Sequence, residues 1–244
     1  WERMHAQARQ IVEDLEKNPP PLPESEIAEG KALLEWLADD HFTFLGYREY
    51  RLDVDGEDDV LRAVPGTGFG ILRGDQDMSA HSGKLPPLVA AKAREKTLLV
   101  LAKANSKATV HRPAHLDYIG VKTFEDGEVV GEQRFLGLYS STAYTESLTR
   151  IPVLRQKAQQ VIDQAGFDPL SHTGKALMDI LENYPRDELF QTPVDELVPT
   201  AEAVLHARSR REVRLFIRKD AYGRFLSCMV YLPRDRYNTA VREK

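Results

Sequence analysis

Several stretches carry residue types that could do chemistry, and each has an ordinary structural alternative. His111, His115 and Asp117 have an H-x3-H-x-D spacing, and imidazole and carboxylate groups are ligands that suit zinc or iron. Pro113 interrupts the helix that usually presents such a spacing, so a polar loop between strands is the favoured interpretation. The glycine cluster 66–70 lacks the spacing of a dinucleotide-binding loop and is interpreted as a turn.

The remaining chemical motifs are equally incomplete. The acidic run 53–59 resembles a calcium loop in composition, but no glutamate closes it, which favours a solvated hairpin tip. Ser140 and Ser141 do not lie in a G-x-S-x-G motif. Cys228 lies in an alternating strand pattern, where a thiol usually packs as a small apolar group. We therefore assign no catalytic, cofactor-binding or metal-binding residue.

Positive charge gathers in the last part of the chain. Residues 206–244 contain eleven Lys/Arg and four Asp/Glu, a local charge of +7, although the whole chain carries −5. Such a patch could bind phosphate or nucleic acid, but arginines at a helix end and on the outer face of a strand favour a solvated face. A third interpretation is an effector carboxylate held by arginine. Our candidate effector-binding residues are Arg218, Asp220, Gly223 and Arg224.

Composition is typical of a globular protein with one or two domains. The chain has 244 residues, of which 42% are hydrophobic and 29% charged. One cysteine excludes an intrachain disulfide, and no apolar run approaches the length of a membrane span. We expect a cytoplasmic protein without membrane or nucleic-acid partners. Apolar residues at helical spacing begin at Trp1 itself, and another helix is expected to begin near residue 239. Both patterns indicate that this sequence is a piece of a longer protein.

Residues 24–141 have the pattern of an α+β domain built on an antiparallel sheet. A helix over 1–16 and a polyproline connector over 18–23 precede a helix capped by Ser25, which ends near 39–41. Strands are expected at 42–52, from Val60, at 69–73, and at 97–104 paired with 108–111, with a short helix from Pro86-Pro87. The clearest hairpin joins 116–124 to 129–139 through an Asp-Gly turn.

The pattern from 145 to 208 is helical, and a hairpin follows it. Helices are expected from Pro152 to Gly166, from a Ser171 cap, and from Thr192-Pro193. Strands 212–219 and 226–230 then flank the turn 220–223, with Val213 on one face. Phe216 and Met229 lie on the other face, either as exposed contact residues or as a second covered face.

Several stretches together resemble the large bacterial class of NAD-dependent glutamate dehydrogenase. Their order and spacing cover nearly the whole chain. They are Phe44-Leu-Gly-Tyr-Arg-Glu-Tyr50, Phe135-Leu-Gly-Leu-Tyr-Ser-Ser141, Ile151-Pro-Val-Leu-Arg155, Tyr184-Pro-Arg-Asp-Glu-Leu-Phe190, Arg214-Leu-Phe-Ile-Arg218 and Tyr222-Gly-Arg-Phe-Leu-Ser-Cys-Met-Val-Tyr-Leu-Pro-Arg-Asp-Arg-Tyr237.

The resemblance implies a parent enzyme that deaminates L-glutamate oxidatively to 2-oxoglutarate and ammonia with NAD. It places the dinucleotide site and the catalytic lysines in a later domain, so this chain would be a non-catalytic regulatory and assembly segment without a cofactor. It further implies a helix and linker (1–23), a PAS-like domain (24–141), a helical segment (142–208) and an incomplete ACT-like α/β sandwich (209–244).

The implied partners are the other domains and subunits of the parent, a homo-oligomer, and an amino-acid effector. The alternative is a purely structural oligomerisation module that binds no small molecule.

Overall fold

The computed structural model describes residues 1–74 and 83–237, and the chain divides into two units. Unit 1 contains Trp1–Glu146 together with Ile151–Val153. Unit 2 contains Ser147–Arg150 together with the chain from Leu154 onward. The segment that joins the two units is therefore shared between them.

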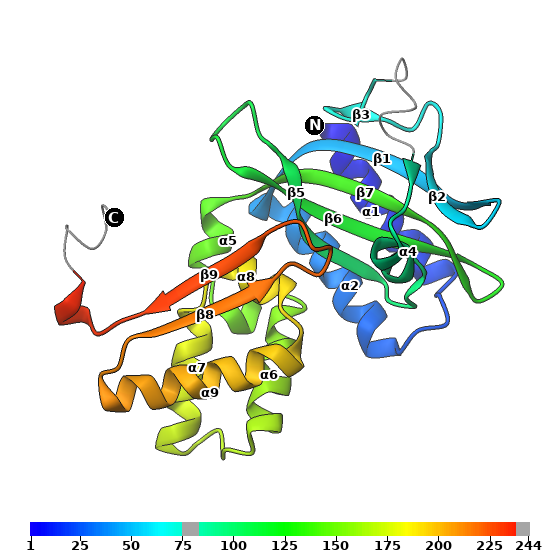
Figure 1. The fold of residues 1–244 in the computed structure, drawn as a ribbon. Coiled ribbons are helices and arrows are strands. Elements are labelled where there is room, and N and C mark those ends of the chain that lie inside the picture. Colours follow the sequence, from blue (N-terminus) through cyan, green and yellow to red (C-terminus); the bar gives the residue numbers. More distant parts are fainter. Residues whose placement is uncertain (75–82, 238–244) are drawn as a thin grey trace. The chain divides into compact units, whose positions relative to one another are not determined.

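Unit 1 is an antiparallel sheet with helices. Its strands follow the order β4-β2-β1-β7-β6-β5, and β3 also pairs with β1 (Figure 1). The strands are β1 (Phe42–Asp55), β2 (Asp58–Ala63), β3 (Phe69–Gly70), β4 (Gly83–Lys84), β5 (Leu99–Lys107), β6 (His115–Glu125) and β7 (Glu128–Tyr139). The helices are α1 (Glu2–Lys17), α2 (Glu24–Trp36), the π-helical segment η1 (Leu37–His41), α4 (Pro87–Arg94) and α5 (Ser141–Thr145).

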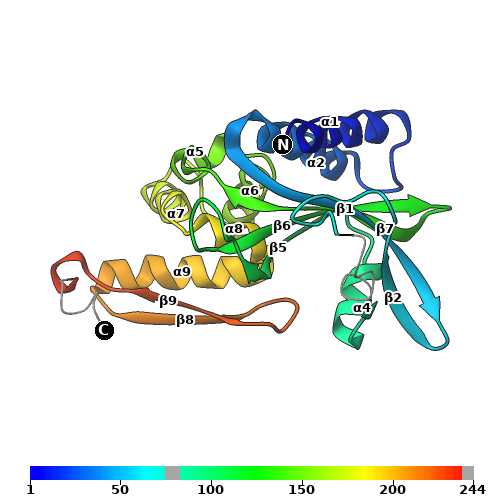
Figure 2. The same cartoon turned by 90° about the horizontal axis from the view of Figure 1, so that it is seen from above.

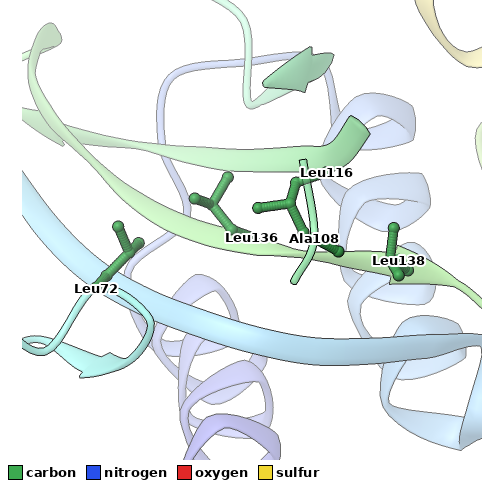
Figure 3. Packing of buried hydrophobic residues seen from close by; sticks show 5 residues of the cluster. All are labelled: Leu72, Ala108, Leu116, Leu136 and Leu138. Carbon is green, nitrogen blue, oxygen red and sulfur yellow. The ribbon is translucent and has the colours of Figure 1, made fainter. Parts of the chain in front are cut away.

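Both faces of the sheet in unit 1 carry buried side chains. Helices α1 and α2 lie on one face (Figure 2), where the His5 ring is 4.9 Å from that of Phe44 and Phe44 is 5.2 Å from Phe135. Because side chains alternate along β7, Leu136 and Leu138 point to the opposite face. There they form a buried cluster with Leu72, Ala108 and Leu116 (Figure 3).

Local signals in unit 1 predict most of its elements. The hairpin β6–β7 is confirmed, and both central residues of its turn have positive φ, 50° at Asp126 and 81° at Gly127, as a type I′ turn requires. The end of the second helix is confirmed as well, since Asp40 at φ 58° leaves the helical conformation. Its predicted start is wrong, because Pro23 occupies the N-cap position and Ser25 lies in the first turn.

The predicted pairing of 97–104 with 108–111 is also wrong. Strand β5 pairs with β6, from Leu99 opposite Val121 to Lys107 opposite His115. Residues 108–114 form the loop between them, closed by a 2.8 Å hydrogen bond from the Ala108 N–H to the Ala114 carbonyl. A left-handed backbone at His111 (φ 65°) turns the chain inside this loop, so no strand forms there.

Unit 2 consists of helices and a β-hairpin. The helices are η2 (Leu148–Arg150), α6 (Leu154–Ala165), α7 (His172–Glu182), α8 (Arg186–Gln191), α9 (Val194–Arg210) and η3 (Arg234–Arg236). The hairpin joins β8 (Arg214–Lys219) to β9 (Leu226–Tyr231), and it runs beside α9 (Figure 2). The predicted hairpin is therefore confirmed, as is the cap of α7, where Ser171 Oγ accepts a 3.0 Å hydrogen bond from the Gly174 N–H.

The start of α6 differs from the prediction. Pro152 is not its first residue, because Val153 has φ 68° and the helix begins only at Leu154. A left-handed conformation is costly for a β-branched side chain. The backbone N–H of Val153 donates a 2.7 Å hydrogen bond to Glu29 Oε2, and this bond holds residues 151–153 in unit 1. Ser147 and Leu148 bond instead to the Glu182 carboxylate in unit 2.

Candidate effector site

A groove of about 450 Å³ lies in unit 2 between α8, the first turns of α9 and the hairpin. The helical side contributes mainly polar residues, and strands β8 and β9 contribute both polar and apolar residues. Its lining residues are Tyr184, Glu188, Thr192, Asp195, Glu196, Pro199, Thr200, Leu215, Phe216, Ile217, Arg218, Ser227 and Met229. The residues of α8 and β8 are far apart in sequence and meet only in the folded unit.

An ion pair crosses this groove. Arg218 Nε donates a 2.9 Å hydrogen bond to Glu188 Oε2, and Arg218 Nη2 donates a 3.1 Å bond to Glu188 Oε1. The two side chains are only 13% and 17% exposed, so solvent screens the pair weakly. This two-point geometry is the one with which a guanidinium also recognises other carboxylates.

A buried hydroxyl without a hydrogen-bond partner lies in the same groove. Thr192 is 3% exposed, and its Oγ1 makes no hydrogen bond within the described structure. Leaving such an atom unpaired costs free energy, so native proteins rarely do it without a reason. Because the oxygen itself is buried, a ligand in the groove would reach it only if neighbouring side chains moved aside.

Lys157 fixes the end of α8 that borders the groove. Its ammonium donates hydrogen bonds of 2.6, 3.1 and 2.9 Å to the carbonyls of Leu189, Phe190 and Thr192. These carbonyls would otherwise lack partners at the helix end. Burial lowers the pKa of Lys157 to about 8, and the positive charge of Arg218 acts in the same direction. The lysine thus secures the groove wall while carrying a charge that its surroundings disfavour.

Tyr184 lines the groove as a neutral phenol. Its side chain is buried, and this burial raises its pKa well above the usual value, with Tyr231 and Glu188 adding to the effect. The site therefore offers a hydroxyl, a guanidinium and a carboxylate. That combination can bind and orient a small polar molecule.

Of the four residues predicted from sequence, Arg218 lies in the groove and the other three form the hairpin turn. Asp220 is 4% exposed and accepts hydrogen bonds from the Tyr222 N–H (3.2 Å) and the Arg224 N–H (3.3 Å). Arg224 Nε also donates to Asp220 at 2.9 Å, and Gly223 takes a positive φ of 68°. The structure therefore brings Asp220, Gly223 and Arg224 together as a self-contained turn and groups Arg218 with Glu188.

Sequence reasoning missed Glu188, Thr192, Tyr184 and Lys157. Helix α8 has only six residues, which is too short for apolar periodicity to reveal it. Glu188 and Arg218 are 30 residues apart, and no local signal connects them. The Tyr184-Pro-Arg-Asp-Glu motif was noted only as part of a family resemblance. The two prolines that flank this segment, Pro185 and Pro193, are the one usable clue in the sequence.

In the H-x3-H-x-D stretch, the aspartate has other partners in the structure. Asp117 forms an ion pair with Lys103 (2.5 Å) and accepts the Tyr139 N–H (3.2 Å). Among residues 1–74 and 83–237, no group of three or more His, Cys, Asp or Glu side chains could hold a metal ion. In those same ranges no helix is long and apolar enough to span a membrane. Cys228, expected to pack as an apolar group, is exposed instead.

The basic region before and within the hairpin is largely neutralised by local carboxylates. Arg208 pairs with Asp179, Arg211 with Asp235 and Arg214 with Glu212, each at 2.7 Å. These exposed pairs contribute little stability, but they remove much of the positive field that a polyanion would need.

Curated relatives match this chain along its whole length. The chain is 41% identical over 253 aligned residues to the NAD-specific glutamate dehydrogenase of Halomonas elongata and 42% identical over 248 to that of Pseudomonas aeruginosa. These alignments cover 99% and 100% of the chain. The chain is homologous to one segment of the NAD-specific glutamate dehydrogenases.

Further comparisons agree with this assignment. The Mycobacterium tuberculosis NAD-specific glutamate dehydrogenase is 37% identical over 86% of the chain. A family model described as glutamate dehydrogenase, helical motif 1, matches residues 151–210, and one described as glutamate dehydrogenase, ACT2 domain, matches 214–244. The chain spans only about 15% of the length of the Halomonas and Pseudomonas proteins. The groove and its ion pair therefore combine residues of both matched regions, with Glu188 in the helical motif and Arg218 in the ACT2 match.

Proposed function

We propose that this chain is a non-catalytic regulatory and assembly segment of a large NAD-dependent glutamate dehydrogenase. The parent reaction would be oxidative deamination of L-glutamate to 2-oxoglutarate and ammonia, with NAD bound in another part of a cytoplasmic enzyme. The observation that carries the proposal is the 41–42% identity across the whole chain to proteins of that name. Its partners would be the other domains and subunits of a homo-oligomer.

The proposed modules keep the boundaries expected from the sequence. Residues 24–141 would be a PAS-like domain, which is supported by the antiparallel sheet with helices on one face. Residues 1–23 would be a helix and linker, 142–208 the helical segment, and 209–244 the beginning of an ACT-like sandwich, supported by the ACT2 match.

The groove of unit 2 would be the effector site. An amino acid presents one carboxylate and one ammonium, the two charges that Arg218 and Glu188 attract when their own pair opens. Such a ligand would shift the parent enzyme between states only by the difference in its affinity for them.

A thermal-shift panel on the 244-residue chain tests this proposal. The ligands are glutamate, glutamine, aspartate, asparagine, leucine, arginine, 2-oxoglutarate, NAD, AMP and ATP. A ligand at about 100 times its Kd stabilises by about 2.7 kcal/mol, which raises Tm by roughly 5 to 10 °C. We expect one amino acid to produce this shift.

The matched variants Arg218→Ala and Arg214→Ala locate the site. Both arginines lie on β8, and each forms an ion pair with a glutamate, but only Arg218 lines the groove. Arg218→Ala should abolish the shift and Arg214→Ala should preserve it. A flat panel with the chain and with the full-length protein would instead favour the alternative, a structural oligomerisation module, which a size measurement would then examine.

A further inference from the structure

His41 is a histidine of unit 1 whose two ring nitrogens both face oxygen atoms. Its side chain lies at the end of η1 and is only 11% exposed. Nδ1 lies 2.8 Å from the carbonyl oxygen of Trp36, and Nε2 lies 3.2 Å from Oε2 of Glu146. A carbonyl or an ionised carboxylate can only accept a hydrogen bond, so each nitrogen donates one. The arrangement is therefore that of a positively charged imidazolium.

The surroundings of the ring favour this charged form. The ring stacks on that of Trp36, with 4.3 Å between the centroids and 17° between the planes, and an indole face attracts a cation. Nδ1 bonds one of the last carbonyls of α2, and the C-terminal end of a helix favours positive charge. Among the residues that the structure describes, Glu146 is the one charged side chain that contacts the ring.

Other titratable or charged side chains near η1 do not contact the ring of His41. Helices α1, α2 and α5 and strand β1 contact η1, and residues 42–46 of β1 contain no such side chain. Burial lowers the pKa of His5, which therefore stays neutral near pH 7. The titratable or charged side chains on η1 and the adjoining parts of the three helices are His5, Arg9, Glu35, Asp39, Asp40 and Tyr144.

Glu146, the partner of His41, lies where the chain first passes from unit 1 to unit 2. Its own N–H donates a 2.8 Å hydrogen bond to the Thr142 carbonyl at the end of α5. The next residue, Ser147, belongs to unit 2, where its Oγ donates a 2.6 Å hydrogen bond to the Glu182 carboxylate. The contact between His41 and Glu146 therefore holds the last residue before the junction.

We propose that His41 and Glu146 form a proton-controlled clamp on the junction between the two units. While the ring is an imidazolium, the contact is an ion pair with a hydrogen bond. When Nε2 loses its proton, its lone pair faces the carboxylate and the contact becomes repulsive. Histidines change charge between about pH 5 and 8, so the clamp closes toward the acidic end of this range and opens above it. Opening releases the end of α5 and the chain that enters unit 2.

Hydrogen exchange followed by mass spectrometry tests the clamp in the wild-type chain and in Glu146→Gln. An amide carries both a donor and an acceptor, so glutamine can bond His41 in either protonation state and the clamp of the variant should not respond to pH. At pH 8.5 the amides of residues 144–148 should exchange roughly threefold faster in the wild type than in the variant. At pH 5.5 the wild type should exchange no faster than the variant. Comparison at equal pH cancels the intrinsic pH dependence of exchange.

A matched control removes a carboxylate from another pair of unit 1. Glu125 lies 3.6 Å from Arg51 in an exposed ion pair. Glu125→Gln should therefore leave the exchange of residues 144–148 unchanged at both pH values.

The fluorescence of Trp36 follows the protonation of the ring itself. In a Trp1→Phe background Trp36 is the one tryptophan, and a stacked imidazolium quenches an indole more strongly than neutral imidazole does. Emission should therefore rise between pH 5.5 and 8.5. The further substitution His41→Gln should remove this rise.

Three results would overturn the proposal. Emission from Trp36 that does not change with pH would show that His41 keeps one protonation state. Equal exchange of wild type and Glu146→Gln at both pH values would show that the contact does not hold the junction. A rate ratio that differs from one but is the same at both pH values would make the contact a structural one without proton control. Because neither residue lines the groove of unit 2, these outcomes are independent of the effector panel.

Discussion

Raising the pH from 7 to 9.5 should stabilise unit 2, and Lys157 is the reason. Its pKa is about 8 in the folded protein against 10.5 for an unperturbed lysine. Between these values the unfolded chain holds a proton that the folded chain has lost, so unfolding takes up a proton and a higher pH favours folding. The gain over this range is about 2 kcal/mol in the free energy of unfolding.

Other groups change less over the same range. Burial raises the pKa values of Tyr47, Tyr184 and Tyr231, so their unfolded forms begin to ionise first and stability falls as the pH approaches 10. At pH 9.5 the three together cost roughly 0.5 kcal/mol. Lys122 of unit 1 also has a pKa lowered by burial and acts in the same sense as Lys157. The contribution of Lys157 is therefore isolated by comparing the free energy of unfolding of the wild type with that of a variant that lacks this lysine.

The assay is urea unfolding of the wild type and of Lys157→Met at pH 7, 8, 9 and 9.5. Far-UV circular dichroism follows the helices of both units, whereas tryptophan fluorescence follows unit 1 alone, which contains both tryptophans, Trp1 and Trp36. A transition seen by circular dichroism and not by fluorescence therefore belongs to unit 2. The stability difference between the two proteins should grow by about 2 kcal/mol, while the fluorescence transition stays common to both. A difference constant within about 0.5 kcal/mol would refute the reasoning, because the three carbonyls would then hold the ammonium charged throughout.

Three further substitutions, two of them with a matched control variant, are measured by the same urea unfolding at pH 7. Ser171→Ala removes the side-chain cap of α7 and should cost about 1 kcal/mol, a prediction that an unchanged midpoint would contradict. Gly137→Ala would push a methyl group against the backbone of β1 and should cost about 3 kcal/mol, whereas Gly83→Ala meets open space and should be neutral. Glu188→Gln leaves a half-buried guanidinium without its carboxylate and should cost about 2 kcal/mol, against less than about 0.5 kcal/mol for Glu212→Gln at an exposed pair.

Sequence reasoning predicted those parts of the fold that local interactions determine. The Asp126-Gly127 turn, the Ser171 cap and the end of the second helix at Asp40 each depend on residues within a few positions of one another. It failed where distant segments compete, as when β5 pairs with β6. Alternation along β8 likewise defined two faces, but only the packing of unit 2 shows that the Phe216 face is the covered one.

The candidate site was predictable only in part, for the same reason. Arginine chemistry pointed to Arg218, which does line the groove. Its partner Glu188 lies on a six-residue helix between Pro185 and Pro193, and nothing in the sequence near either residue connects the two. Asp220 was predicted as part of the turn 220–223 beside Arg218, and the structure uses its carboxylate to hold backbone N–H groups of that turn.

The shared junction determines where this protein can be divided. Residues 147–150 belong to unit 2, where the carboxylate of Glu182 binds them, and residues 151–153 belong to unit 1, where Glu29 binds Val153. Any single cut between 146 and 154 takes a native segment from one unit or the other. Separate expression of the two units therefore calls for overlapping boundaries, with the first clone extended through Val153 and the second started no later than Ser147.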